Sequence, residues 1–266
     1  MSASRAVRDV AVLTTRNLIH IRREPLRLSD VTIQPVLFTL LFIYVLGAGV
    51  VIAHGASYTQ YAIAGLLAMN LTTSAIGTAV GLSDDLASGV VDRFRTLPIW
   101  RPAVLVARSL SDLMTATLCA LIVVGTGAVA GWSPDASLPS VVAGVAIFLV
   151  FAYGISWACA CIGLFSRDAE SSQGLGLVIL FPLAIVSNAL VPTEHMPAVI
   201  RAIANWNPVS AVTAASRRLL GNPNPAAGVH AWPMQHPVLA ALLWSLALVA
   251  VFAPLAARMY GSRTRD

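Results

Sequence analysis

The sequence predicts an all-α polytopic membrane protein that crosses the bilayer six times, with an amphipathic helix before the first crossing. The first observation is composition, because 57% of the 266 residues are hydrophobic and only 11% are charged. Soluble domains carry about 25% charged residues. The second observation is spacing, because the charges lie between long stretches without Asp, Glu, Lys or Arg. These charge-free stretches are residues 31–83, 113–134, 136–166, 171–193 and 219–257.

The N-terminal segment, residues 1–30, is predicted to form a cytoplasmic helix that lies along the membrane surface. Apolar side chains recur there at helical spacing, and the arginines fall mostly away from them. Such a helix places its apolar face among lipid tails and its arginines among lipid phosphates. An exposed soluble helix is the alternative interpretation. The predicted apolar stripe is Val7, Val10, Ala11, Leu18 and Ile21.

Six transmembrane spans follow from the lengths of the charge-free stretches. A helix needs about 20 apolar residues to cross about 30 Å of hydrocarbon. The first stretch is long enough for two spans, which the polar residues 53–57 separate. The transmembrane domain is residues 31–258, and residues 259–266 form a cytoplasmic tail. The predicted spans are residues 31–53, 59–83, 110–131, 140–165, 172–191 and 237–257.

The arginines predict the orientation of these spans. Arg and Lys near span ends resist translocation and therefore collect on the cytoplasmic side. If the N-terminus is cytoplasmic, fourteen arginines lie inside and three outside, namely Arg201, Arg217 and Arg218. Both termini are therefore predicted to be cytoplasmic. The net charge of +5 belongs to the cytoplasmic flanks, where membrane lipids and not nucleic acid are the expected partner.

The longest cytoplasmic loop, residues 84–108, contains a short amphipathic pattern. Apolar side chains recur at helical spacing on one face, and charged side chains occupy the other. A helix of about two turns is not stable alone in water, so it must rest on the membrane surface or on a partner protein. Gly89 and Pro98 bound this helix; its apolar face is Val90, Val91, Phe94 and Leu97, and its polar face is Asp92, Arg93 and Arg95.

The outer segment, residues 192–236, separates the fifth and sixth predicted spans. Asn207-Pro208 and Gly221-Asn222-Pro223 interrupt its apolar stretches, which predicts short helices that partly re-enter the outer leaflet. Arg217 and Arg218 lie at its boundary with the membrane. We interpret this pair either as a site for lipid phosphates or as an ordinary solvated pair.

The residue inventory excludes several kinds of chemistry. All 17 basic residues are arginine, so the lysine on which a P-loop depends is missing. If ATP drives this protein, the motor is therefore another polypeptide. The five histidines lie in tails or loops, which disfavours an intramembrane serine protease. Cys119, Cys159 and Cys161 are interpreted as packing residues inside spans.

Two other classes remain open as alternatives. A membrane-embedded prenyl- or phosphotransferase would bind Mg²⁺ through clustered acids, for which Asp84 and Asp85 are the candidates. A secondary carrier would usually keep an ionisable residue in mid-span, and the span centres carry none. Asp112 lies four residues after Arg108, at the cytoplasmic start of the third span, where an ion pair along the helix is the simpler interpretation.

The order and spacing of these fragments resemble the membrane subunits of ABC type-2 exporters, in particular the daunorubicin-resistance-like permeases. The resemblance covers nearly the whole chain, from the N-terminal helix through the six spans and the Gly89 to Pro98 loop to a late motif. That motif reads Val191-Pro192-Thr193-Glu194-His195-Met196-Pro197, then Asn207-Pro208-Val209-Ser210, then Arg217-Arg218-Leu219-Leu220-Gly221.

The resemblance implies a non-catalytic transport subunit without a cofactor of its own. In that family the loop after the second span is a coupling helix, which docks in a cleft of a separate ATP-binding subunit that holds ATP and Mg²⁺. By this resemblance Val90, Phe94 and Leu97 would be docked, Asp92, Arg93 and Arg95 would make rim contacts, and Asp84 or Asp85 would lie near the hinge to the second span.

The resemblance further implies an assembly in the bacterial plasma membrane. Two copies of the ATP-binding subunit would join this chain and a second permease subunit, identical or different. The family moves drugs, antibiotics, lipids and polysaccharides. Because the spans are rich in Leu, Val and Ala and lack a concentration of Trp and Tyr suited to sugars, we expect export of a hydrophobic or amphipathic compound from the cytoplasm or the inner leaflet.

Overall fold

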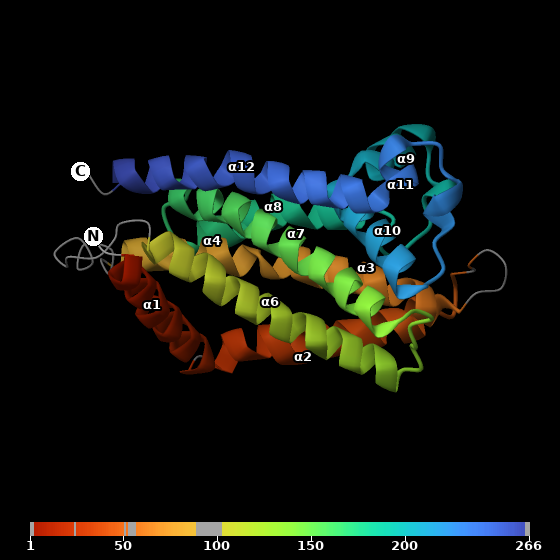
Figure 1. Ribbon diagram of the computed structural model, residues 1–266, viewed down its shortest axis with the longest axis horizontal. Helices are drawn as coiled ribbons and strands as arrows, with labels where there is room; N and C mark the ends of the chain where they lie inside the picture. Colours follow the sequence, from red (N-terminus) through yellow and green to blue (C-terminus); the bar gives the residue numbers. More distant parts are fainter. Residues whose placement is uncertain (1–2, 24, 51, 53–56, 89–102, 264–266) are drawn as a thin grey trace.

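A computed structural model describes residues 3–23, 25–50, 52, 57–88 and 103–263, which form an elongated bundle of helices (Figure 1). Within this part of the chain no strand occurs, and the all-α fold class is confirmed. Five helical stretches are long and apolar enough to cross a membrane, and each overlaps a predicted span. They are Leu28–Leu46, Tyr58–Ala87, Ala103–Val129, Leu138–Phe165 and Pro237–Ser262.

The long helices contain two interruptions, both in the first half of the chain. The first stretch combines α2 (Pro25–Leu41) with a π-helical turn, Phe42–Leu46. The second combines α3 (Tyr58–Ser74) with α4 (Ile76–Ala87), and the two helices meet at Ala75. The other three stretches correspond to the continuous helices α6 (Ala103–Val129), α7 (Leu138–Phe165) and α12 (Pro237–Arg263).

The fifth predicted span, residues 172–191, corresponds to a shorter helix. Helix α8 (Ala169–Ile185) has 17 residues and is followed by non-helical residues 186–192. Asp168 caps its first turn, because the Ser171 N–H donates to Asp168 Oδ1 at 2.7 Å. This hydrogen bond holds the pKa of Asp168 below its ordinary value. The described residues therefore contain five helices long and apolar enough to span a membrane and the shorter apolar helix α8, and the count of six stays a prediction.

The N-terminal helix α1 (Ala3–Arg23) packs against α6 and α2. Leu13 and Thr14 are buried in this contact, and the Thr14 hydroxyl donates to the Ala107 carbonyl at 3.5 Å. Of the predicted apolar stripe, Val10 packs into the same cluster, whereas Val7 and Ala11 are exposed. The face that α1 turns toward the bundle is therefore centred on Leu13, beside the predicted stripe.

Short helices occupy the end of the bundle opposite to the start of α1 and the end of α12 (Figure 1). Among them α10 is buried along nearly its whole length between α3, α7 and α12. The predicted short helices of the outer segment are thus present, and their re-entry into the leaflet stays a prediction. They are η3 (Thr193–His195), α9 (Ala198–Trp206), α10 (Pro208–Leu220), η4 (Pro225–Gly228) and α11 (Trp232–Gln235).

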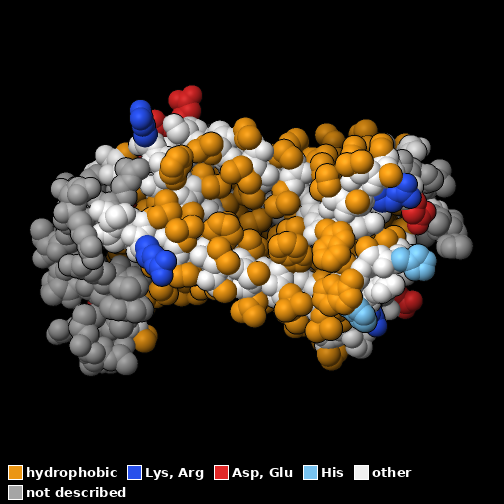
Figure 2. Space-filling model, turned by 90° about the horizontal axis from the view of Figure 1, so that it is seen from above, with side chains coloured by type: hydrophobic (Ala, Val, Ile, Leu, Met, Phe, Trp, Pro, Cys, Tyr) orange, Lys and Arg blue, Asp and Glu red, His pale blue; other side chains and the backbone are white. Residues whose placement is uncertain are grey.

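The flanks of the bundle expose large apolar side chains. Examples are Leu37 on α2, Leu121 on α6, Val178 on α8 and Leu246 on α12, each at least 60% exposed. Figure 2 shows the middle of one face covered by apolar side chains, with charged side chains toward the ends. Extended exposed apolar surfaces of this kind mark contact with a membrane or a partner, as expected for a multi-pass protein.

Candidate functional site

A chain of polar side chains ties α1, α4 and α6 together at the terminal end, the end where α1 begins and α12 ends. Arg16 Nη2 lies 3.0 Å from Asp85 Oδ1, and Arg108 Nη1 lies 4.0 Å from Asp85 Oδ2. Arg108 Nε also lies 3.4 Å from Asp112 Oδ1, which confirms the predicted ion pair along the helix. Thr78 Oγ1 donates to Asp112 Oδ2 at 2.7 Å. These five residues are called the ion-pair chain below.

The side chain of Arg108 fits against a glycine surface on α4. Its Nη2 donates to the Gly77 carbonyl at 2.7 Å, and its guanidinium lies where a Cβ on Gly81 would stand. The side chain is only 13% exposed. Because one guanidinium contacts two carboxylates and a main-chain carbonyl, it fastens α6 to α4 from the first turn of α4 at Gly77 to its last turn at Asp85.

The predicted hinge residues both lie in the last turn of α4. Asp85 belongs to the ion-pair chain, and Asp84 beside it is exposed. Helix α4 continues to Ala87 and α6 begins at Ala103, so the connection between these helices is shorter than the predicted loop 84–108. The predicted coupling residues lie outside the described residues; they are Gly89, Val90, Val91, Asp92, Arg93, Phe94, Arg95, Leu97 and Pro98.

The transferase alternative receives no support from Asp84 and Asp85 in this arrangement. The Asp85 carboxylate is already engaged by the guanidinium groups of Arg16 and Arg108. Across the described part of the chain, no group of three or more His, Cys, Asp or Glu side chains is arranged to hold a metal ion.

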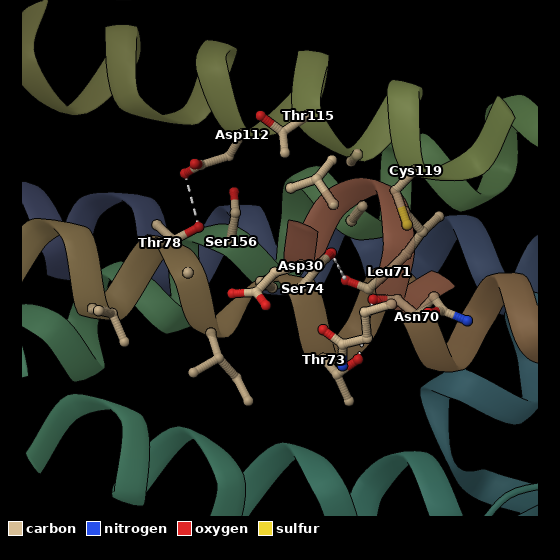
Figure 3. Close-up of a pocket in the computed structure, with 18 of the residues that line it drawn as sticks. Asp30, Asn70, Leu71, Thr73, Ser74, Thr78, Asp112, Thr115, Cys119 and Ser156 are labelled. Atoms are coloured by element: carbon tan, nitrogen blue, oxygen red, sulfur yellow. Dashed lines mark hydrogen bonds between the residues drawn. The ribbon is translucent and has the colours of Figure 1, made fainter. Parts of the chain in front are cut away.

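A cavity of about 320 Å³ lies beside the ion-pair chain, between α2, α3, α4, α6, α7 and α8 (Figure 3). This volume is in the range of small-molecule sites. The junction of α3 and α4 at Ala75 lies in its wall, and polar side chains from six helices face it. The polar lining consists of Asp30, Gln34, Asn70, Thr73, Ser74, Thr78, Arg108, Asp112, Thr115, Ser156 and Gln173.

The sequence analysis did not single out this cavity as a site. A signal for it is present in the second predicted span, where Asn70, Thr72, Thr73 and Ser74 follow one another within an otherwise apolar stretch. Polar residues inside a span usually face the interior of a bundle or a water-filled cavity. Their partners on α2, α7 and α8 are distant in the sequence, so only the folded chain brings the lining together.

Arg217 is buried in the interior at the opposite end, with 0% exposure. Its Nε donates to the Tyr61 carbonyl at 3.1 Å, its Nη1 to the Asn188 carbonyl at 2.9 Å, and its Nη2 to the Ala189 carbonyl at 2.8 Å. The guanidinium carbon also lies 3.6 Å from the centre of the Tyr61 ring, a favourable position for a cation. These four residues are called the arginine node below.

The arginine node overturns both interpretations of Arg217 in the outer motif. Arg217 neither faces lipid phosphates nor forms a solvated pair with its neighbour, because it is buried while Arg218 is exposed. A sequence pattern that indicates the burial of Arg217 lies on the same face of α10. Ser210, Thr213 and Ala214 precede it at helical spacing, and such small side chains allow close packing of the helix.

The remaining outer-motif residues build the ends of the short helices. Asn207 caps α10 by accepting from the Val209 N–H at 2.8 Å, and its Nδ2 donates to the Leu183 and Val186 carbonyls at 2.7 and 2.6 Å. Pro208 takes the first helical position, which suits its missing N–H. Gly221 ends α10 with φ +69°. Pro192 precedes η3, and Glu194 is exposed within η3. Pro197 precedes α9.

The apolar flanks, the spanning helices and the polar cavity between them define a polytopic membrane protein of the transporter class. A family model described as ABC-2 type transporter matches residues 8–220. The chain therefore belongs to the ABC-2 type transporter family, which confirms the resemblance found in the sequence.

Proteins similar to this chain include transport permeases of bacteria and of an alga. The Daunorubicin resistance ABC transporter permease protein DrrB1 of Streptomyces coeruleorubidus is 32% identical, over 98% of this chain and 91% of that protein. The Probable doxorubicin resistance ABC transporter permease protein DrrC of Mycobacterium tuberculosis is 25% identical, over 94% and 87%. The Putative transport permease ycf38 of Pyropia yezoensis is 24% identical, over 82% and 76%.

Proposed function

We propose that this chain is the membrane-spanning permease subunit of an ATP-driven exporter for a hydrophobic or amphipathic compound. The observation that carries the proposal is the ion-pair chain, through which Asp85 joins the last turn of α4 to α1 and α6. The predicted coupling segment begins at Gly89, four residues after Asp85. A partner that moves this segment therefore acts directly on three helices of the bundle.

The proposed topology has six crossings with both termini in the cytoplasm of a bacterial cell. It is supported by the fourteen arginines that this orientation keeps inside, and by the start of α1 and the end of α12 at one end of the bundle (Figure 1). Helix α8 with the residues after it would supply the fifth crossing. Residues 1–30 would then lie on the inner membrane surface, and residues 192–236 would face outward.

The free energy for export would come from ATP in a separate subunit. The absence of lysine from this chain supports that division, because a P-loop needs its lysine. We expect two copies of the ATP-binding subunit, which would hold ATP and Mg²⁺, and a second permease subunit that completes the path. This chain would contribute no catalytic residue.

The proposed mechanism is a rearrangement of helices. Val90, Phe94 and Leu97 would dock in the partner, and movement of that segment would pull on the end of α4. Because Asp85 is held by Arg16 and Arg108, the pull would reach α1 and α6 together. Shifts of packed helices by a small distance are a common way to open a path.

The proposed passenger is a drug, an antibiotic or a lipid. The names of two similar proteins refer to daunorubicin and doxorubicin resistance, and the spans offer mainly Leu, Val and Ala side chains. Compounds with a large apolar body would partition into such a bundle from the cytoplasm or from the inner leaflet.

The first test replaces Phe94 at the centre of the proposed docked face. Phe94→Asp should remove passenger-stimulated ATPase activity and lower recovery of the complex with the ATP-binding subunit, because a charge would enter an apolar contact. Phe94→Leu is the matched control and should retain both. Unchanged export and unchanged complex recovery in the Asp variant would contradict the proposal, as would transport or transferase activity of the purified single chain.

A further inference from the structure

We propose that the cavity beside the ion-pair chain binds the ammonium end of an amphipathic compound, with Asp30 as the counter-charge. The site lies within a single subunit. The proposal rests on the proposed export function, and it adds where the compound binds and which of its chemical groups is recognised. Three features carry it: the direction of the hydroxyl hydrogen bonds, the balance of charge in the lining, and the apolar side chains of the lining.

Four hydroxyl groups in the lining already donate their hydrogen to a main-chain carbonyl of their own helix. Ser74 Oγ donates to the Leu71 carbonyl at 3.1 Å, Thr115 Oγ1 to the Ser111 carbonyl at 2.9 Å, and Ser156 Oγ to the Tyr153 carbonyl at 2.8 Å. Thr73 likewise donates within its own helix, to the Met69 carbonyl at 2.9 Å. A hydroxyl has one hydrogen and two lone pairs, so these four groups offer the cavity acceptors.

The amide of Asn70 can still donate and accept. Its Nδ2 donates to the Leu66 carbonyl at 2.8 Å, which leaves one N–H and the acceptor Oδ1. The guanidinium of Arg108 is a donor, but it already contacts Asp112, Asp85 and the Gly77 carbonyl. The amides of Gln34 and Gln173 in the lining can donate or accept. Groups that can only accept include the four hydroxyl groups above and the Asp30 carboxylate, and these favour a ligand that supplies N–H donors.

The charges of the lining also favour a cation. Asp30 and Asp112 carry two negative charges, and Arg108 carries one positive charge. Both oxygens of Asp112 are engaged, by Arg108 and by Thr78. Among the described residues Asp30 has no ion pair or hydrogen bond to its carboxylate, and Figure 3 shows this carboxylate projecting among the lining side chains.

The lining also has apolar side chains, which are interspersed with the polar groups named above. They include Leu71, Ala116, Cys119, Ala152 and Leu177. On α6 the lining runs from Arg108 to Cys119, a rise of about 16 Å at 1.5 Å per residue. A ligand with an ammonium group near Asp30 and an apolar body pointing toward Cys119 would match both kinds of side chain in this lining.

Two sources can supply this ligand chemistry. One is a free amphipathic amine, and the other is the primary ammonium of an aminophospholipid headgroup from the surrounding membrane. Phosphatidylcholine has the same phosphate and glycerol backbone but a quaternary ammonium without N–H donors, so it is a comparison for the lipid source.

The test measures binding of two fluorescent probes to the purified full-length chain in phosphatidylcholine nanodiscs. One probe is a dansyl group on a pentylamine, and the other is its N-acetylated, uncharged analogue. We expect the amine to bind about tenfold more tightly, as a charge-assisted hydrogen bond would give. Asp30→Asn should reduce this preference to less than twofold, while Asp30→Glu should retain most of it.

A control variant and a labelling measurement guard against a folding defect. Asp135→Asn removes an exposed carboxylate near the start of α7 and should leave the preference unchanged. A photoreactive diazirine at the apolar end of the amine should label peptides that contain Leu71 and Cys119. The proposal is overturned if both probes bind equally to the unaltered chain, if Asp30→Asn keeps the preference, or if labelling falls on α9 and α12.

Addition of phosphatidylethanolamine to the nanodiscs identifies the source of the ligand. If it competes with the amine probe, the ammonium site takes a lipid headgroup; if it does not, the site takes free amines. The proposed export function is tested separately with Phe94→Asp, and it is contradicted if export and complex recovery are unchanged in that variant. Loss of export in that variant, together with an unchanged probe preference in Asp30→Asn, would overturn the ammonium site and leave the export function standing.

Discussion

The two ends of the bundle hold their arginines in opposite ways. At the opposite end, Arg217 is fully buried and donates to three main-chain carbonyls. At the terminal end, Arg16 and Arg108 contact the carboxylates of Asp85 and Asp112, and these side chains are between 13% and 37% exposed. The same side chain thus joins neutral, fixed oxygens at one end and partly solvated charges at the other.

This difference indicates which end can rearrange. If a buried guanidinium breaks its hydrogen bonds to carbonyl groups, its charge is left in the interior without compensation. This costs a large free energy. The Arg16–Asp85 pair is the most exposed contact of the ion-pair chain, at 37% and 20%, and exposed ion pairs contribute only about 0–1 kcal/mol. We therefore expect the arginine node to act as a rigid joint and the Arg16–Asp85 contact to separate and re-form. The cavity lies beside the ion-pair chain.

Close contacts of glycine with a neighbouring main chain occur at both ends of the bundle. Gly65 on α3 lies against the main chain of Ala189, where a Cβ would overlap the carbonyl group. Ala189 is also one of the acceptors of the arginine node. At the terminal end Gly77 faces open space, but a Cβ on Gly163 of α7 would overlap the Ala79 carbonyl of α4. Backbone contacts that no side-chain rotation can relieve therefore occur at both ends.

The largest effect is expected from Arg217→Leu, which tests the rigid joint. The substitution removes the three hydrogen bonds that the guanidinium donates, and a hydrogen bond to a charged group contributes about 1.5–3 kcal/mol. The Asn188 carbonyl keeps one donor, the Tyr61 hydroxyl at 2.7 Å. We expect a loss of about 3 kcal/mol or more in the free energy of unfolding. Thermal unfolding of the purified chain in detergent measures it.

Arg218→Leu is the matched control for this variant, because Arg218 is adjacent and exposed. A surface substitution of this kind changes stability by about 0.5 kcal/mol or less. Equal melting temperatures of the two variants would show that the guanidinium of Arg217 does not hold the opposite end together.

A smaller effect is expected from Gly65→Ala, which tests the backbone contact. The added methyl group forces α3 and Ala189 apart, and overpacking of this kind costs about 1–3 kcal/mol. Gly77→Ala is the control, because its Cβ meets nothing within 4 Å and alanine favours a helix by up to about 1 kcal/mol. The contrast is contradicted if both variants melt at the same temperature.

Most of the fold could be predicted from charge spacing. Charge-free stretches located all five helices that are long and apolar enough to span a membrane, because the hydrocarbon layer requires about 20 apolar residues in a row. The same reasoning misjudged details that local sequence does not determine. Helix α8 ends at Ile185 because the carbonyls of Leu183 and Val186 are satisfied by Asn207, a residue from another helix.

The sites could be predicted only in part, for the same reason. The pair Arg108 and Asp112 was predictable because both residues lie on one helix, four positions apart. The position of Arg217 was not predicted, because the small residues on its face of α10 indicate close packing but do not show that the partner is α3. The cavity was missed because its lining comes from six helices, and because Asn70 and Ser74 have no neighbouring charge to mark them.

The smallest change in stability is expected from Asp85→Asn, which tests the end that can rearrange. Loss of the contact with Arg16 should lower the free energy of unfolding by about 1 kcal/mol or less, and high salt should remove most of that difference. Export should nevertheless fall severalfold, because α4 loses its link to α1. A double-mutant cycle with Arg16→Gln separates this link from other effects. If the two substitutions reduce export independently, the ion pair does not transmit movement, and the terminal end is held by packing alone.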